Sequence, residues 1–180
     1  MKLIWWALGL FVGTILYGAL SCWLLFTTLW DITSALLLFV LSAAAFLLAI
    51  IGYRNFRSIF GKIGGWLLGT GSFLLAGFFL LFLLLKPVAL TLGGVKHITA
   101  SESPDGYYTV NFIYFDAGAT GTFGIRGELD GPLWFTKRVY YEQRVTEVDV
   151  IWKNDNTIVI NGHSMNLQKG EVFGTAQENE

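Results

Sequence analysis

The sequence predicts a membrane protein with three transmembrane helices followed by a small antiparallel β domain, either sandwich-like or a rolled sheet. Residues 3–29, 32–53 and 63–85 form uncharged, apolar segments. Each is long enough to cross a hydrocarbon core of about 30 Å at about 1.5 Å per residue. After residue 87 the apolar pattern changes from continuous to alternating, which is typical of β-strands. Hydrophobic residues make up 54% of the chain, more than in an ordinary soluble domain.

The positions of the basic residues predict the orientation in the membrane. The connection between the second and third segments carries Arg54, Arg57 and Lys62 and no acidic residue, so it should remain in the cytoplasm. Lys2 places the N-terminus on the same side. The third helix then leads outward, and we expect everything after Pro87 to be extracytoplasmic.

The two predicted domains differ in charge. Residues 1–87, the transmembrane region, carry five basic residues and one acidic residue, whereas residues 88–180 carry seven basic and twelve acidic residues. We expect the β domain at 88–170 and a disordered tail at 171–180. An acidic outer domain with scattered basic residues argues against nucleic acid as its partner. The single cysteine, Cys22, lies in the first apolar segment, so packing alone must stabilise the β domain.

Small residues recur at four-residue spacing in the three apolar segments. They are Gly9 and Gly13 in the first segment, Ala45 and Ala49 in the second, and Gly61, Gly65, Gly69 and Gly77 in the third. Small residues at this spacing let helix backbones approach closely in lipid. Two interpretations remain open. Either the three helices pack on one another, or the glycines form a docking surface for another membrane subunit or a second copy.

The region after residue 94 divides into about six antiparallel strands. The expected strands before the last hairpin cover residues 95–99, 108–114, 122–129, 138–142 and 145–152. Ser-Pro-Asp-Gly at 103–106 matches a type I turn, with Pro at its second position and Gly at its fourth.

The last two hairpins can be predicted to their register. A three-residue loop at 154–156 sets Trp152 opposite Ile158 and keeps the apolar side chains on one face. Residues 161–162, Asn-Gly, then form a two-residue turn, because both residue types tolerate positive φ. That turn places Ile158 opposite Met165.

Four side chains of the β domain are candidates for a recognition surface: Arg126, Glu128, Tyr107 and Tyr140. Arg126 and Glu128 lie two residues apart on one strand face. They form either a recognition pair for a charged ligand or a surface ion pair worth less than about 1 kcal/mol. Tyr107 and Tyr140 lie opposite the predicted core face, on a sugar- or partner-binding surface or on a second buried face of a sandwich. Phe115 and Trp134 share that assignment.

No residue pattern predicts catalysis, a metal site or a cofactor. His163 has no second His or Cys at useful spacing, because His97 is distant in sequence. Asp116 and Glu142 would suit a glycosidase-like pair, but the sequence does not set their separation. Residues 118–121 form a weak phosphate-binding loop that lacks a lysine and a following helix.

Five sequence blocks carry a family resemblance. They are SPDGYYTV at 103–110, GAT at 118–120, IRGEL at 125–129, VYY at 139–141 and NTIVING at 156–162. In this order and spacing, they resemble a family of small membrane-anchored proteins of unknown function from Bacillus and related Gram-positive bacteria, over about residues 100–167. Its members usually have one membrane anchor before this domain, so three helices are a departure. The resemblance implies the bacterial plasma membrane and assigns no activity to any residue.

The function that we expect is non-enzymatic. The outer β domain would bind a partner or ligand at the cell surface, in sensing, immunity against a secreted toxin or envelope maintenance. The alternative is an accessory subunit whose helices dock to a larger membrane complex; an envelope hydrolase acting through carboxylates has the least support. Transport is disfavoured because Asp31, at an interface, is the only charge between the flanking basic residues of the apolar segments. The expected partners are the lipid bilayer and a membrane or cell-surface protein.

Overall fold

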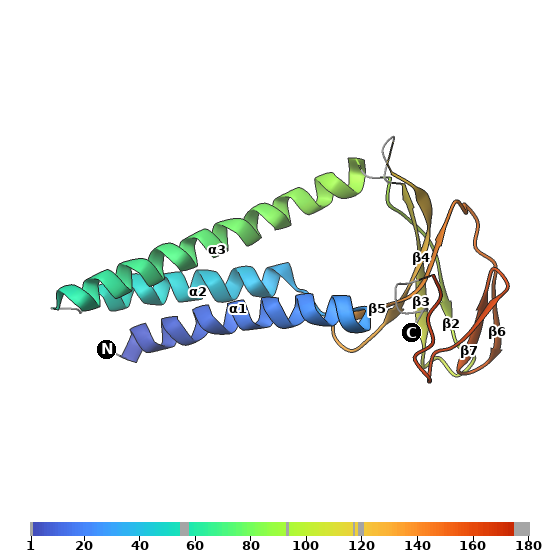
Figure 1. Cartoon of the computed structure of the whole chain (residues 1–180), viewed down its shortest axis with the longest axis horizontal. Coiled ribbons are helices and arrows are strands. Elements are labelled where there is room, and N and C mark those ends of the chain that lie inside the picture. Colours follow the sequence, from blue (N-terminus) through green and yellow to red (C-terminus); the bar gives the residue numbers. More distant parts are fainter. Residues whose placement is uncertain (1, 55–57, 93, 117, 119–120, 175–180) are drawn as a thin grey trace. The chain divides into compact units, whose positions relative to one another are not determined.

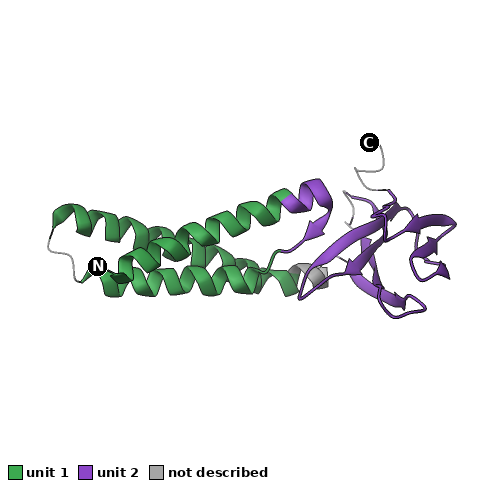
Figure 2. Ribbon diagram, turned by 90° about the horizontal axis from the view of Figure 1, so that it is seen from below, with its two compact units in different colours: residues 1–23, 33–88 green, residues 24–32, 89–180 purple. Residues whose placement is uncertain are grey.

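The structure, a computed structural model, describes residues 2–54, 58–92, 94–116, 118 and 121–174. The chain divides into two compact units (Figure 2). The helical unit comprises Met1–Trp23 and Thr33–Val88, and the β unit comprises Leu24–Ile32 and Ala89–Glu180. The predicted order of three long apolar helices followed by antiparallel sheets is confirmed.

Three helices of the described residues are long and apolar enough to cross a membrane. They are α1 (Lys2–Thr28), α2 (Ala35–Tyr53) and α3 (Ile59–Leu92) (Figure 1). The start of α2 is later than predicted because Ser34 is its N-cap, with the Ser34 side chain accepting a hydrogen bond from the Leu37 amide at 3.3 Å. The end of α3 is later than predicted because the helix continues through Pro87.

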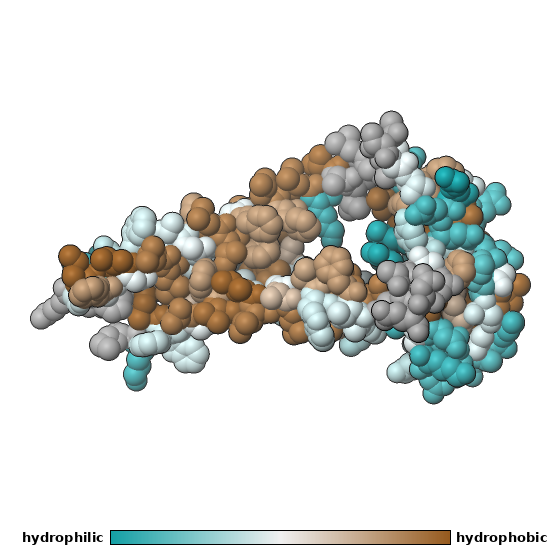
Figure 3. Space-filling model, in the orientation of Figure 1, coloured by the Kyte–Doolittle hydropathy of each residue, from teal (hydrophilic) through white to brown (hydrophobic). Residues whose placement is uncertain are grey.

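The interior of the helical unit is built mainly from small side chains, with Leu38 and Leu68 as larger buried residues. Ala7, Ala45 and Ala49 are fully buried, whereas large apolar side chains such as Trp66 and Phe78 are more than half exposed. Hydrophobic residues accordingly cover the outside of the helices (Figure 3). This distribution suits helices that approach closely and expose their apolar side chains to lipid.

The described residues of the β unit form two antiparallel sheets (Figure 1). The five-stranded sheet has the order β1 (Trp30–Asp31), β5 (Thr136–Gln143), β4 (Phe123–Asp130), β3 (Thr109–Asp116), β2 (Lys96–Glu102). The three-stranded sheet has the order β6 (Val150–Asn154), β7 (Thr157–Ile160), β8 (His163–Asn166). Phe112 and Ile125 of the first sheet and Ile158 of the second belong to one buried cluster, so the two sheets share a core.

The connection between α1 and α2 contributes a strand, which the sequence analysis did not predict. Trp30 pairs with Lys137 in the β1–β5 ladder. Leu29, directly after α1, has φ of 61°, and its carbonyl accepts a hydrogen bond from the Arg138 amide at 3.1 Å. A left-handed backbone costs a residue with a β-carbon about 1–2 kcal/mol. The burial of Leu29, which is 9% exposed, offsets that cost.

The predicted pairings of the last hairpins are confirmed, and one loop length is corrected. Trp152 lies opposite Ile158, and Ile158 opposite Met165. Asn161 and its following glycine have φ of 47° and 87°, as the predicted turn requires. The β6–β7 loop has two residues instead of three, because Asn154 pairs with Thr157 and a bulge after Trp152 takes up the extra residue.

Two other predicted boundaries are wrong. The strand predicted to begin at residue 145 begins at Val150. The predicted disordered tail, 171–180, is ordered at its start, because Phe173 exchanges two backbone hydrogen bonds with β5, to the Val139 carbonyl and from the Tyr141 amide. Residues 175–180 lie outside the described part of the chain.

Candidate functional site

The turn between β2 and β3 is held by side-chain and backbone hydrogen bonds. The Ser103 carbonyl accepts from the Gly106 amide at 2.8 Å, and the Ser103 amide donates to the Tyr108 carbonyl at 2.9 Å. Asp105 Oδ1 accepts from Ser103 Oγ at 2.5 Å and from the Tyr107 amide at 3.0 Å. Ser103 Oγ also accepts from the Tyr108 amide at 2.9 Å. The predicted turn at 103–106 is therefore confirmed, and residues 103–108 form a rigid unit, here called the Tyr107 turn.

The Asp105 carboxylate accepts two of the hydrogen bonds that hold this turn. Hydrogen bonds from the Ser103 hydroxyl, and then from the Tyr107 amide, hold the pKa of Asp105 below its ordinary value. Both donors favour the charged form of the carboxyl group. The turn therefore has its full set of hydrogen bonds at neutral pH.

The Tyr107 turn presents one aromatic side chain to solvent. Tyr107 is 77% exposed, and its ring meets the half-buried Tyr108 ring edge-on at a centroid distance of 4.8 Å. Tyr108 in turn packs against the core. An exposed tyrosine on a rigid base is suited to recognition, because little conformational entropy remains to be lost on binding.

Arg126 and Glu128 form the predicted ion pair. Arg126 Nε lies 2.9 Å from Glu128 Oε1, and the two side chains are 31% and 21% exposed. The Arg126 Nε atom makes no hydrogen bond, so the contact is ionic. Glu128 lies opposite Asn111 of β3, four residues along the chain from Tyr107. The structure therefore brings the ion pair together but does not join it to the Tyr107 turn.

Tyr140 is completely buried, so its assignment to an exposed recognition surface is wrong. A bulge in the β4–β5 ladder explains the error. Gly127 lies opposite Tyr140 and Glu128 opposite Arg138, which leaves Val139 as an extra residue. The alternation of faces is broken there, and both Val139 and Tyr140 enter the core.

The buried Tyr140 joins the two sheets. Its hydroxyl donates to Glu142 Oε2, and Asn161 Nδ2, from the β7–β8 turn, donates to the Tyr140 hydroxyl at 3.2 Å and to Glu142 at 3.1 Å. Burial, followed by the interaction with Glu142, raises the pKa of Tyr140. Phe173 stacks on the Tyr140 ring, and His163 stacks on Phe173 with centroids 3.6 Å apart. These contacts give Tyr140, Glu142 and His163 structural roles.

The remaining candidates for chemistry, Asp116 and Glu142, make separate hydrogen bonds. Asp116 accepts a hydrogen bond from the Gly118 amide at 2.8 Å, whereas Glu142 is bonded within the Tyr140 cluster. Within the described residues, no group of three or more His, Cys, Asp or Glu side chains could hold a metal ion. Residues 119–120 of the weak phosphate-loop candidate lie outside the described residues.

The predicted small-residue faces are only partly used for packing within the helical unit. Gly65 and Gly69 are buried on α3, and a Cβ at Gly69 would lie 3.9 Å from the Ala49 Cβ. Gly9 and Gly13 are exposed, and a Cβ on either would meet no atom within 4 Å. The same holds for Gly77, whereas Gly61 is half-buried.

Gly9, Gly13 and Gly77 therefore make no close helix contact within the described helical unit, and their use as a docking surface stays a prediction. On α1 the buried side chains are instead Ala7, Thr14 and Ser21, at seven-residue spacing. Thr14 and Ser21 tolerate burial because their hydroxyls donate to the backbone carbonyls four residues earlier, at 2.7 and 2.9 Å.

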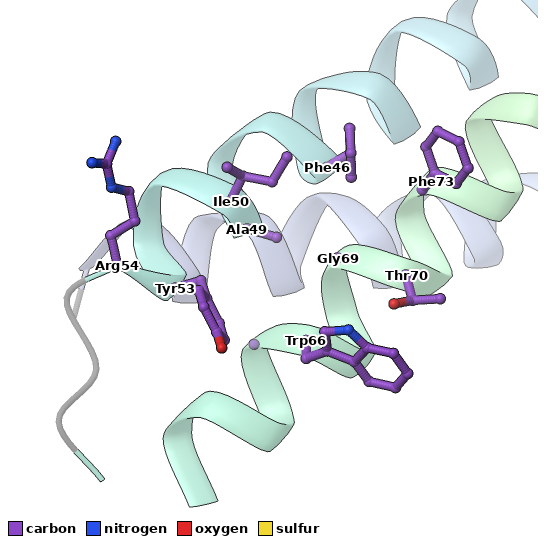
Figure 4. A pocket seen from close by; sticks show the side chains of 10 residues that line it. Phe46, Ala49, Ile50, Tyr53, Arg54, Trp66, Gly69, Thr70 and Phe73 are labelled. Atoms are coloured by element: carbon purple, nitrogen blue, oxygen red, sulfur yellow. The ribbon is translucent and has the colours of Figure 1, made fainter. Parts of the chain in front are cut away.

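A groove of about 490 Å³ lies between α2 and α3, and the sequence analysis did not predict it (Figure 4). Its lining residues are Phe46, Ala49, Ile50, Tyr53, Arg54, Gly65, Trp66, Gly69, Thr70 and Phe73. The lining side chains come from both α2 and α3 and are small or aromatic for the most part, while Arg54 points away from the others (Figure 4). Such a groove can accommodate an acyl chain or the side chains of another helix. The sequence feature that could have indicated this groove is a small residue, Gly69, between two aromatic residues, Trp66 and Phe73.

A second cavity, of about 360 Å³, opens at the start of β2. Lys96, His97, Ile98, Tyr114 and Thr146 line it. His97 Nε2 lies 3.4 Å from Asn111 Oδ1. The mixed lining offers hydrogen-bonding groups for a small polar ligand without a cluster of acidic or basic groups.

Comparisons with known proteins identify the family of the chain. A model described as "Family of unknown function (DUF5412)" matches residues 66–177. Comparisons with curated proteins and with solved structures found no match. The matched range extends beyond the resemblance at 100–167 and includes most of α3 and every strand from β2 to β8. Because this range covers more than half of the sequence, the chain belongs to this family of unknown function.

Proposed function

We propose that this protein is a non-enzymatic, multi-pass protein of the bacterial plasma membrane that presents its β unit on the outer side for binding. The Tyr107 turn is the proposed contact site for a cell-surface partner or ligand. Sensing, immunity against a secreted toxin and envelope maintenance are the cellular roles that suit this arrangement. Three helices of membrane-spanning length and composition support the membrane placement.

The proposed orientation is supported by the basic residues. Arg54 and Lys62 flank the α2–α3 connection, and Lys2 precedes the apolar part of α1. Arg57, the third basic residue of that connection, lies outside the described residues. Basic residues in short loops favour the cytoplasmic side. With an odd number of crossings, the β unit is then outside.

The binding proposal rests on one observation: the Tyr107 turn is held by hydrogen bonds, but the Tyr107 side chain that it carries is exposed to solvent. The turn is held by five hydrogen bonds, four of which involve the backbone, yet Tyr107 leaves 77% of its surface in solvent. Such exposure contributes little to folding, because the ring is not removed from water. Tyrosine is enriched among residues that dominate binding energy at protein interfaces.

Site-specific photocrosslinking in native membranes tests the proposal. A benzoylphenylalanine at position 107 should give a defined adduct of higher mass. The matched control is the same group at Ile151 of β6, which is 57% exposed and lies outside the Tyr107 turn. An adduct at 107 that is absent at 151 supports the proposal. Equal adducts at both positions, or none at 107, would refute it.

A second candidate function, an accessory subunit that docks through its helices, is favoured by the unused glycines of α1. Gly9 and Gly13 lie one turn apart with open space around them. In this case Gly13→Leu should dissociate a membrane complex on native gels and leave the melting temperature of the isolated protein unchanged. If the Tyr107 turn is the contact site, the same variant should leave the adduct at position 107 intact.

A further inference from the structure

The tip of the β4–β5 hairpin, residues 131–135, exposes two large apolar side chains. Leu133 is 81% exposed and Trp134 is 47% exposed. Leu133 also has φ of 62°, a left-handed conformation that is unfavourable for a residue with a β-carbon. Burial, which compensates for the same conformation at Leu29, is missing at Leu133.

The tip is nevertheless well defined. The Gly131 amide donates to the Phe135 carbonyl at 2.8 Å, and the Phe135 amide donates to the Pro132 carbonyl at 3.1 Å. The Trp30 ring lies against Gly131 so closely that a Cβ there would be 2.5 Å from the ring. Only glycine fits this position, and the tip is fixed against β1.

Hydrogen bonds connect the tip to the residues between α1 and α2. Trp134 Nε1 donates to the Ile32 carbonyl at 2.9 Å. The neighbouring Thr136 pairs with Asp31 in the β1–β5 ladder. All these residues belong to the β unit, so the position of the tip relative to Ile32 is set by contacts within that unit.

The length of α2 fixes the depth of Ile32 in a membrane. The helix has 19 residues, which span about 29 Å at about 1.5 Å per residue, almost the full hydrocarbon thickness of about 30 Å. If α2 crosses the bilayer, Ala35 must lie at the edge of the hydrocarbon. Ile32 precedes Ala35 by three residues, which can span at most about 10 Å. Ile32, and with it the Trp134 indole, therefore lies within reach of the headgroup layer.

We propose that the β4–β5 hairpin tip is a membrane-interface anchor, with Trp134 at the level of the lipid headgroups and Leu133 inserted at the acyl boundary. This inference rests on the membrane placement in the proposed function. Tryptophan prefers the membrane–water interface, where its ring and its N–H are both accommodated. The exposed leucine then removes its apolar surface from water on insertion, which offsets its unfavourable backbone. The anchor would hold one end of the β unit at the bilayer surface.

The test is a spin-label measurement on the full chain in phosphatidylcholine–phosphatidylglycerol bilayers. In a Cys22→Ala background, a nitroxide is attached at Leu133→Cys and, as controls, at Tyr107→Cys and Ile151→Cys. Power saturation compares collisions with oxygen, which concentrates in lipid, and with a nickel chelate, which remains in water. The ratio of oxygen to nickel accessibility at 133 should exceed the ratios at both controls several-fold. Because Leu133 is 81% exposed, the label leaves the core intact, which an unchanged circular dichroism spectrum verifies.

Two outcomes would overturn the inference. A label at 133 with the same nickel accessibility as at 107 lies in water. A label at 133 shielded from both reagents is covered by protein, such as a second copy of the chain. Alkaline carbonate extraction of the same membranes separates this failure from that of the proposed function. A chain that is extracted contradicts the membrane placement itself, whereas an integral chain with a water-exposed label contradicts only the anchor.

Discussion

The β unit buries most of its large apolar side chains in its interior, whereas the helical unit exposes most of its own on its outer surface. In the β unit Phe112, Ile125 and Tyr140 are fully buried. In the helical unit small residues such as Ala49 make up most of the interior, alongside Leu38, and Phe78 is 61% exposed. The β unit is therefore stabilised by removing large apolar surfaces from water, and the helical unit by the close approach of its backbones. This difference is expected if, as proposed, the helical unit lies in lipid and the β unit lies in water.

The largest expected effect on stability is that of a Phe→Ala truncation in the β unit, compared with the same truncation in the helical unit. Phe112→Ala should destabilise the β unit by about 3–5 kcal/mol, because it leaves a cavity in the core. Phe78→Ala, at an exposed position of α3, should have a much smaller effect, because no protein cavity forms there. Denaturant unfolding of the full chain in detergent micelles, followed by near-ultraviolet circular dichroism, measures both. Equal losses would mean that Phe78 is buried and that the contrast between the units is false.

Overpacking tests the interior of the helical unit. Gly69→Leu should cost about 1–3 kcal/mol, because the added side chain meets Ala49 and separates α2 from α3. Gly13→Leu is the matched control, since the space around Gly13 is open. Thermal melting in detergent should show a lower midpoint for the first variant and no change for the second. A loss of stability with Gly13→Leu would show that α1 packs through its glycines after all.

The Arg126–Glu128 ion pair should contribute less to the free energy of unfolding than the packed interior of either unit. Arg126→Ala should lower the free energy of unfolding by less than about 1 kcal/mol, since both partners of the ion pair are partly exposed and screened by water. The measurement is denaturant unfolding at low and at high salt, and the small effect should shrink as the salt concentration rises. A loss of several kcal/mol that does not depend on salt would mean that this face of the sheet is buried.

The smallest effect is a local one, in the Tyr107 turn. Because the pKa of Asp105 is lowered in the folded state, its contribution to the order of the turn is complete at neutral pH. It should be lost only as the pH falls below about 4. In an NMR titration the Tyr107 amide shift should follow the Asp105 carboxyl, with a midpoint below that of an ordinary aspartate. Asp105→Asn should abolish the titration, and a midpoint at the ordinary value would contradict the hydrogen-bonded carboxylate.

Local chemistry made part of the β unit predictable. The pairing of Trp152 with Ile158 follows from alternation along two adjacent strands, and the turn at 161–162 from residue types that tolerate positive φ. The prediction for Tyr140 failed because the bulge at Val139 shifts the alternation by one residue. That bulge depends on how β4 and β5 pair, which the local pattern does not encode.

Strand pairings between residues that are far apart in the chain could not be predicted from the sequence. Trp30 pairs with Lys137, more than one hundred residues later, and two residues are too few to show a strand pattern. The same limit applied to the candidate site. The Tyr107 turn is formed by neighbouring residues and was predictable. The proposed role of the tip at 131–135 depends on the hydrogen bond from Trp134 to the Ile32 carbonyl, about one hundred residues earlier in the chain, which no local pattern indicates. Glycine spacing likewise could not show which face of α1 packs.

The proposed function requires the β unit and the α2–α3 connection to lie on opposite sides of the membrane, which cysteine labelling can determine. In a Cys22→Ala background, Tyr107→Cys and Ser58→Cys would be treated with a membrane-impermeant maleimide, in intact and in permeabilised cells. Both positions are exposed in the structure, so protection must come from the membrane. We expect Tyr107→Cys to be modified in intact cells and Ser58→Cys only after permeabilisation. Modification of Ser58→Cys in intact cells, with Tyr107→Cys protected, would contradict this placement.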